Sequence, residues 1–172
     1  MLKHVLDMNR SILLNKHFQS FLLIIFIILF DRFIKYWVIS YFNAESSGII
    51  YLAPFLNIDL IWNKGIAFGL LSFNESYFYN IISLVIAVII IVLVIMSLKS
   101  QGFKRYSILM IVGGALGNLH DRIFFKAVPD FIDFHVGNFH WFVFNAADIF
   151  ITIGVIFLIL FELIDNNKEN YE

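Results

Sequence analysis

Four long apolar stretches dominate the pattern of hydrophobic and polar positions along the chain. They run from about Phe18 to Val38, Phe78 to Leu98, Tyr106 to Phe124 and Phe144 to Leu163. Each stretch is close to the roughly 20 residues that an α-helix needs to cross a hydrocarbon core about 30 Å thick. The pattern therefore predicts an all-α membrane protein with four transmembrane helices in a single domain, residues 1–172.

The connection at about residues 43–77 has a different period. Alternate positions from Leu56 to Trp62 are apolar, which is typical of a half-buried β-strand. Gly48 to Leu52 is predicted as a second strand, with Pro54 in the turn between the two. We therefore expect a small extracytoplasmic β-sheet, a cradle on the outer surface of the membrane.

Lysine and arginine gather beside one set of span ends, which the positive-inside rule assigns to the cytoplasm. Both termini and the short loop between spans two and three are therefore predicted to be cytoplasmic. The first stretch runs into charged residues without a small-residue cleavage pattern, so we expect an uncleaved helix rather than a signal peptide. The cytoplasmic set is Lys3, Arg10, Lys16, Lys99, Lys104 and Arg105, against Lys64 and Lys126 in the outer connections.

Composition agrees with a membrane protein. Hydrophobic residues make up 60% of the 172 and charged residues 15%, whereas soluble domains are about 45–50% apolar and about 25% charged. The net charge of −1 gives no electrostatic basis for binding nucleic acid. Cysteine is absent, which excludes thiol catalysis, thiolate metal sites and disulfides.

Ten charged and amide residues in or beside the apolar stretches gather at one predicted depth. A charge at a helix centre costs about 2.5–3.5 kcal/mol on insertion scales, so such residues usually serve a function. With the predicted topology, these ten fall near the outer face of the membrane. The set comprises Asp31, Arg32, Lys35, Asn118, Asp121, Arg122, Asn145 and Asp148, with Asp130 and Asp133 in the connection between spans three and four.

Two Asn-x-x-Asp pairs stand out in this set. Asn118 and Asp121 are three residues apart, so they share a helix face, and Asn145 and Asp148 repeat the spacing. An asparagine can orient a neighbouring carboxylate by a hydrogen bond without adding charge. Asn145 also fits a helix N-cap, which does not exclude a functional role.

Two further features bear on how these groups meet. Asp31 and Lys35 are four residues apart and can form an ion pair, whose role is open between structure and substrate binding. Small residues at 113–117 let helices approach closely in membranes. Such packing would bring the carboxylates of spans three and four together.

Two carboxylates held close together share a proton, so one can act as base and the other as acid toward a scissile carbonyl. Spacing alone makes Asp121 and Asp148 as good a pair as any that includes Asp130. Asp121, however, sits next to Arg122 in a motif that we expect to be internally paired. Such pairing lowers the pKa of a carboxylate and makes it a poor proton reservoir.

Other chemistries have weaker support. The serines lack a basic partner at helical spacing, and Thr152 follows Asp148 by four residues. No His-Glu-x-x-His pattern supports a metal site, and His135 and His140 are expected to be loop residues. A proton channel or transporter would need charges through the full membrane depth, and a scaffold would not need them at one depth.

Five blocks of sequence, in order, carry a resemblance to a known family. They read Asp31-Arg-Phe-Ile-Lys35, Asn63-Lys-Gly-Ile-Ala-Phe68, Gly113-Gly-Ala-Leu-Gly-Asn-Leu-His-Asp-Arg122, Val128-Pro-Asp-Phe131 and Phe144-Asn-Ala-Ala-Asp148. Over roughly residues 26–154 the chain resembles the lipoprotein signal peptidases, or signal peptidase II. The third and fifth blocks are specific together, whereas any one block alone is weak.

The resemblance implies an aspartic endopeptidase of the bacterial inner membrane with its active site near the outer face. It would cleave diacylglyceryl-modified prolipoproteins just before the lipidated cysteine, without metal or cofactor. Its partners would be these precursors and membrane lipids, and we expect a monomer. The family's catalytic pair maps to Asp130 and Asp148. The other matching positions, expected to be structural supports or substrate-positioning groups, are Asp31, Lys35, Asn63, Gly65, Asn118, Asp121, Arg122 and Asn145.

Overall fold

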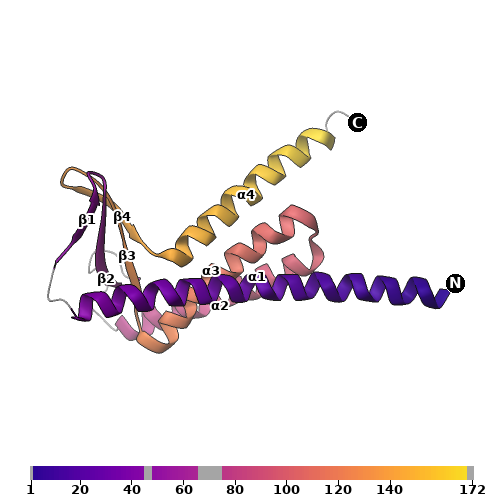
Figure 1. Cartoon of the computed structure of the whole chain (residues 1–172), viewed down its shortest axis with the longest axis horizontal. Helices are drawn as coiled ribbons and strands as arrows, with labels where there is room; N and C mark the ends of the chain where they lie inside the picture. Colours follow the sequence, from indigo (N-terminus) through magenta and orange to yellow (C-terminus); the bar gives the residue numbers. More distant parts are fainter. Residues whose placement is uncertain (1, 45–47, 66–74, 170–172) are drawn as a thin grey trace.

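The computed structural model describes residues 2–44, 48–65 and 75–169, and the side chains of 15–44, 48–65, 77 and 79–165. Four helices and a four-stranded sheet make up these ranges, and the sheet lies at one end of the helix bundle (Figure 1). The elements are α1 (Leu2–Ala44), β1 (Ile50–Ala53), β2 (Leu56–Asn63), α2 (Glu75–Lys99), α3 (Gly102–Phe125), β3 (Val128–Val136), β4 (Phe139–Phe144) and α4 (Ala146–Glu169).

Three of the described helices are long and apolar enough to cross a membrane: Tyr79–Lys99, Gly102–Phe125 and Ala146–Asp165. These agree with predicted spans two, three and four, although the fourth begins at Ala146, because Phe144 ends strand β4. Helix α1 contains the predicted first span but is not among the three. The count of four spans therefore stays a prediction.

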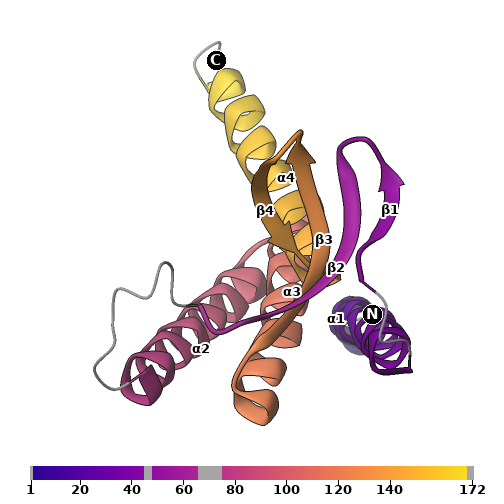
Figure 2. The same cartoon turned by 90° about the vertical axis from the view of Figure 1, so that its left-hand side faces the viewer.

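The strands form one antiparallel sheet in the order β1-β2-β3-β4, seen from its end of the molecule in Figure 2. The predicted hairpin is present, with β1 at Ile50–Ala53 rather than Gly48–Leu52 and β2 at Leu56–Asn63. A bulge between Ile58 and Ile61 brings Ile61 opposite Asp130 of β3.

The expectation that His135 and His140 are loop residues is wrong. His135 lies in β3 and His140 in β4, and the two are register partners. The missed signal is Gly137-Asn138 between two runs rich in β-branched and aromatic residues, a typical hairpin turn. Gly137 adopts the positive φ, 57°, that such a turn requires.

The small residues of α3 allow close helix packing, as predicted. A Cβ atom added to Gly114 would collide with the backbone oxygen of Ala147 in α4. A Cβ on Gly113 would lie 3.0 Å from side-chain carbons of Ile27 in α1. Helix α3 packs against all three other helices, so it is the centre of the bundle.

The ends of the bundle differ in what they contain. The two chain termini and the α2–α3 turn lie at the end away from the sheet, and α1 projects further there than the other helices (Figure 1). The sheet, the end of α3 and the start of α4 meet at the other end (Figures 1 and 2). The predicted functional residues lie at this sheet end.

Candidate active site

A tight turn carries the chain from α3 into the strand that holds Asp130. Helix α3 ends at Phe125, and Lys126 adopts a left-handed conformation with φ 58° and ψ 16°. Strand β3 begins two residues later at Val128. The turn therefore places Asp130 beside the last turns of α3.

Asn145 begins α4 with a reciprocal pair of capping hydrogen bonds. Its side-chain Oδ1 accepts from the backbone N–H groups of Ala147, at 2.9 Å, and Asp148, at 3.3 Å. Asp148 Oδ2 in turn accepts from the backbone N–H of Asn145 at 3.1 Å. This is the geometry of a capping box, so the second Asn-x-x-Asp pair is a helix start.

Asp130 is bound by two neutral amides from two different elements. Asn63 Nδ2, at the end of β2, donates to Asp130 Oδ2 at 2.8 Å, and Asn145 Nδ2 donates to Oδ1 at 2.6 Å. The residue is 4% exposed. Burial raises the pKa of Asp130 above its ordinary value, the two amide hydrogen bonds lower it, and the charge of Asp148 raises it.

Asp148 has a similar set of partners. Asn118 Nδ2 donates to its Oδ1 at 2.8 Å, and the backbone N–H of Asn145 donates to its Oδ2. Asn145 thus donates to both Asp130 and Asp148, with its side chain to one and its backbone to the other. One residue therefore sets the relative position of the two carboxylates.

The orientation of all three asparagine amides follows from what their oxygens accept. Asn63 Oδ1 accepts from the backbone N–H of Gly65 at 2.6 Å, and Asn118 Oδ1 accepts from Lys35 Nζ at 2.8 Å. Asn145 Oδ1 accepts from two N–H groups at the start of α4. With each oxygen occupied by a donor, each NH₂ group must point at a carboxylate. These three residues hold the carboxylates without adding positive charge.

Asp121 lies in a different environment. Arg32 binds it in a bidentate arrangement, with Nη2 2.8 Å from Oδ2 and Nη1 bonded to Oδ1. Lys35 Nζ lies 2.7 Å from Oδ2. The expected pairing of Asp121 with Arg122 is therefore wrong, since its cations come from α1. Asp121 is nevertheless paired with cations, as expected, although they are Arg32 and Lys35.

Asp31 links α1 to the start of α4. It is fully buried, and its Oδ1 accepts from the backbone N–H of Ala147 and from Lys35 Nζ, both at 3.0 Å. Arg32 Nη2 donates to Oδ2 at 2.6 Å. The predicted Asp31–Lys35 ion pair is confirmed, and the carboxylate also stabilises a helix N-terminus.

Arg32 also belongs to the ion network of Asp31, Lys35 and Asp121. The sequence placed it in the set of polar residues at one depth, but not among the expected site residues. Besides its two carboxylates, it donates to the Gly117 carbonyl at 3.1 Å and lies 2.8 Å from His120 Nδ1. Two cations and two carboxylates meet here, so the charges of the four side chains balance.

Arg122 lies on the other side of the site, with unused hydrogen-bonding capacity. Its guanidinium carbon is 5.5 Å from the ring centroid of Tyr79. A Cβ atom added to Gly65, whose φ is 73°, would lie 2.9 Å from Arg122 Nη1. Among the described residues, Arg122 Nε and Nη1 are buried without hydrogen-bond partners. Ile66 to Phe68 of the same motif lie outside the described residues.

Two cavities open on the carboxylate pair from different sides. One of about 440 Å³ is lined by Asp130 together with Ile61, Trp62, Asn63, Lys64 and Val143. The other, of about 260 Å³, is mostly apolar and is lined by Asp148 together with Phe142, Phe144, Ile149, Thr152 and Ile153. Each carboxylate of the pair therefore faces a cavity of its own.

Asp133, the remaining carboxylate of the predicted set, lies apart from this pair. His140 Nδ1 is 2.8 Å from its Oδ2, and Asn57 is its register partner on β2. Within the described ranges, no group of three or more histidine and carboxylate side chains could hold a metal ion. The carboxylates of the predicted set therefore separate into an amide-bound pair, an ion network and this Asp–His contact.

Comparison with known proteins shows similarity along most of the chain. Residues 23–164 match the family described as Signal peptidase (SPase) II, Peptidase_A8. A lipoprotein signal peptidase of Pelagibacter ubique is 51% identical over 159 residues, which cover 92% of this chain and 96% of that protein. The corresponding enzyme of Francisella tularensis subsp. novicida is 39% identical over 160 residues, 91% of this chain and 98% of that protein.

Two solved structures of bacterial membrane enzymes have the same fold. One is 34% identical with a TM-score of 0.67, and covers 87% of this chain and 90% of its own. The other is 33% identical with a TM-score of 0.68, and covers 84% and 92%. The similarity therefore spans the helices and the sheet together.

Proposed function

Because this chain belongs to the signal peptidase II family, aspartic-type peptidases that remove signal peptides from prolipoproteins, we propose that Asp130 and Asp148 are its catalytic pair. One observation carries the assignment: Asn145 binds both carboxylates, and no described cation lies within ion-pair distance of either. Asp121, the alternative partner that spacing left open, is neutralised by Arg32 and Lys35.

The proposed mechanism needs one proton on the pair. The ionised carboxylate accepts a proton from a water molecule, whose oxygen attacks the scissile carbonyl carbon, while the protonated carboxyl donates to the carbonyl oxygen. The tetrahedral intermediate then loses the amine, which takes a proton from the pair, while a hydroxyl proton of the intermediate returns to the pair as the new carboxyl group forms. The two carboxyls titrate as a unit, so acid and base roles belong to the pair.

The substrate in this proposal is a diacylglyceryl-modified precursor, cut just before its lipidated cysteine. The apolar cavity beside Asp148 suits a hydrophobic part of the precursor, and the cavity beside Asp130 suits its polar backbone. Arg122, two of whose nitrogens have no partner among the described residues, would bind a carbonyl or lipid oxygen. The 44–69 segment, of which the structure describes residue 44 and residues 48–65, would clamp the precursor.

The proposed orientation follows from charge. The chain is a membrane-embedded, multi-pass protein. We place both termini and the α2–α3 turn in the cytoplasm, because lysine and arginine gather at that end. In this orientation the site lies near the outer face and α1 forms a fourth span. We also propose, as a separate point, that the chain works as a monomer.

Cleavage of a diacylglyceryl-modified prolipoprotein by the purified protein tests the proposal. Asp130→Asn and Asp148→Asn should each lower turnover by about 10²–10⁴-fold, the usual contribution of a positioned acid or base. Asp133→Asn is the matched control, because it makes the same change in a buried carboxylate of the same strand. It should keep turnover near the wild-type value, with or without a chelator.

Two results would decide against parts of the proposal. If folded Asp130→Asn cleaved normally while folded Asp121→Asn did not, the pair would be Asp121 and Asp148. If the wild type cut the unmodified precursor as fast as the lipid-modified one, the proposed lipid requirement would be wrong.

A further inference from the structure

At the end of the bundle away from the sheet, Arg105 is buried between α3 and α1, and none of the described carboxylates forms an ion pair with it. The residue is 2% exposed. Its Nε and Nη2 donate to Ser20 Oγ at 3.0 and 2.6 Å, and Nη2 lies 3.4 Å from His17 Nδ1. Among the described side chains Ser20 and His17 are its only partners, and Nη1, itself buried, has none.

A cation in this position is expensive to keep. Burying a charge costs several kcal/mol, by order of magnitude, unless an opposite charge offsets it. Arg32, at the sheet end of the same two helices, is offset by Asp31 and Asp121. Ser20 brings no charge to Arg105, because its hydroxyl donates to the Lys16 carbonyl and only accepts from the guanidinium. The positive charge of Arg105 therefore lacks a counterpart in the described part of the chain.

The start of α3 adds to the positive potential at this place. Arg105 lies just after the N–H groups that have no partner within the helix, at the positive end of the helix dipole. The N-cap residue, Gln101, makes no side-chain cap hydrogen bond, and the first turn contains no acidic residue. Lys16 Nζ, 3.3 Å from the carbonyl of Ser100, adds a second cation.

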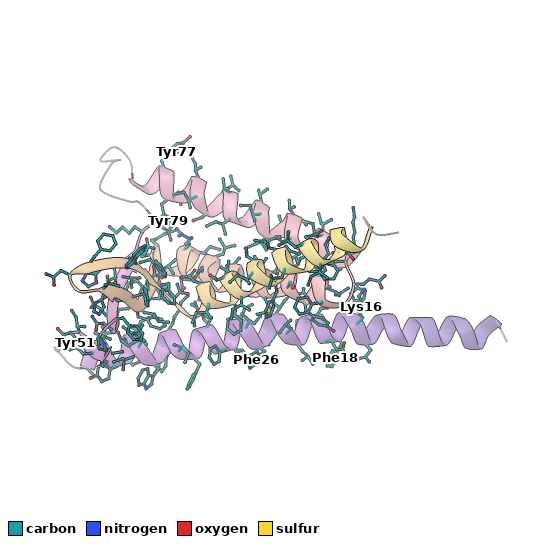
Figure 3. The ribbon with its side chains drawn as sticks, turned by 90° about the horizontal axis from the view of Figure 1, so that it is seen from above. Lys16, Phe18, Phe26, Tyr51, Tyr77 and Tyr79 are labelled. Atoms are coloured by element: carbon teal, nitrogen blue, oxygen red, sulfur yellow. The ribbon has the colours of Figure 1, made fainter. Side chains whose placement is uncertain are left out.

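We propose that the junction of the first turns of α3 with the 16–20 segment of α1 binds a phosphate group, with an anionic phospholipid as its source. Phosphate oxygens would accept from Arg105 Nη1 and from backbone N–H groups of the helix start. Basic sites between transmembrane helices are typical binding places for such headgroups. Exposed Phe18 and Phe103 flank the junction and offer contact to acyl chains. Figure 3 shows Lys16 and Phe18 on α1 at this end of the molecule.

Thermal unfolding of the full chain in detergent tests the proposal, with titrations of phosphatidylglycerol, phosphatidylcholine and inorganic phosphate. Phosphatidylglycerol should stabilise the wild type, and Arg105→Gln should need about fivefold more of it for the same change in unfolding temperature, since one basic residue contributes about 1 kcal/mol. Lys104→Gln is the matched control: it removes the same charge one residue away, where Lys104 pairs with Glu162. This variant should respond like the wild type.

The three titrations separate the outcomes. Stabilisation by phosphatidylglycerol but not by inorganic phosphate assigns the site to a lipid headgroup, and an equal response to inorganic phosphate assigns it to free phosphate. The same phosphatidylglycerol response in Arg105→Gln and the wild type would overturn the proposal. Should Arg105→Gln not fold, native mass spectrometry of the wild type decides, because equal retention of phosphatidylglycerol and phosphatidylcholine from an equimolar mixture would also overturn it. Neither readout depends on the catalytic pair proposed above.

Discussion

The two Asn-x-x-Asp pairs have the same spacing but opposite electrostatic environments. In the first, Asp121 accepts from Arg32 and Lys35, so its negative charge is neutralised by cations. In the second, the partners of Asp148 among the described residues are the Asn118 amide and the Asn145 backbone, and its neighbour Asp130 accepts from two amides. A cation beside a carboxylate lowers its pKa more strongly than a neutral amide does, so amides can orient a carboxylate that must gain and lose a proton.

The two environments are also connected. Lys35 Nζ donates to Asp121 and to Asn118 Oδ1, and Asn118 then donates to Asp148. The ion network thus fixes the amide that orients a member of the proposed catalytic pair. A buried charge cluster can therefore support catalysis by holding a neutral donor in place.

Replacing the neutralised carboxylate should have the largest effect on stability. Asp121→Asn leaves Arg32 and Lys35 against a neutral amide, so the free energy of unfolding should fall by about 3–5 kcal/mol. Asp133→Asn, also buried but paired only with a half-exposed histidine, should lose about 1 kcal/mol. Unfolding in detergent measures both, and equal losses would contradict the contrast between the two environments.

Stability should also depend on pH through Asp130. Because its pKa is raised in the folded state, the folded protein binds the proton more tightly than the unfolded chain. The resulting stabilisation is complete below the ordinary carboxyl pKa of about 4 and is lost as pH rises through the raised pKa, by about 1.4 kcal/mol for each pH unit that separates the two pKa values. Asp130→Asn removes this dependence. A constant difference between wild type and variant at all pH values would exclude the raised pKa.

Removing one amide donor should change the pH profile of cleavage. The hydrogen bond from Asn63 lowers the pKa of Asp130, so Asn63→Ala should raise it further. The acid limb of kcat/KM should then move to higher pH. Asn57→Ala, on the same strand but opposite Asp133, should leave the limb unchanged. A move of the limb to lower pH in Asn63→Ala would show that the amide does not favour the ionised form.

The smallest expected effect concerns the turn that joins the two environments. Lys126 adopts a left-handed conformation that costs a non-glycine residue about 1 kcal/mol. Lys126→Gly should therefore raise the free energy of unfolding by about that amount without changing cleavage. Lys126→Ala keeps the conformational cost and should show no gain. A gain in both variants would assign the effect to the lysine side chain instead.

Local patterns predicted much of this arrangement. The period-two alternation predicted β2, the hydropathy predicted the three confirmed spans, and the four-residue spacing predicted the Asp31–Lys35 pair. A capping role for Asn145 was predicted as compatible with a functional role, and the residue caps α4 with its oxygen. Its bond to Asp130 was not predicted, because the NH₂ group that makes it faces a strand rather than the same helix. The expected partner of Asp121 was wrong, because a neighbour in sequence on a helix points elsewhere.

By itself, the sequence determined the class of protein, the family and the set of polar residues that gather at one depth. These follow from local composition, periodicity and motif order, none of which requires knowledge of distant neighbours. Only the tertiary structure decided the partners. Arg32 reaches Asp121 across 89 positions and Asn63 reaches Asp130 across 67. The charge of a hydrogen-bond donor strongly affects the pKa of the carboxylate that it binds. Which donor binds each carboxylate depends on contacts between helices and strands that are far apart in the chain.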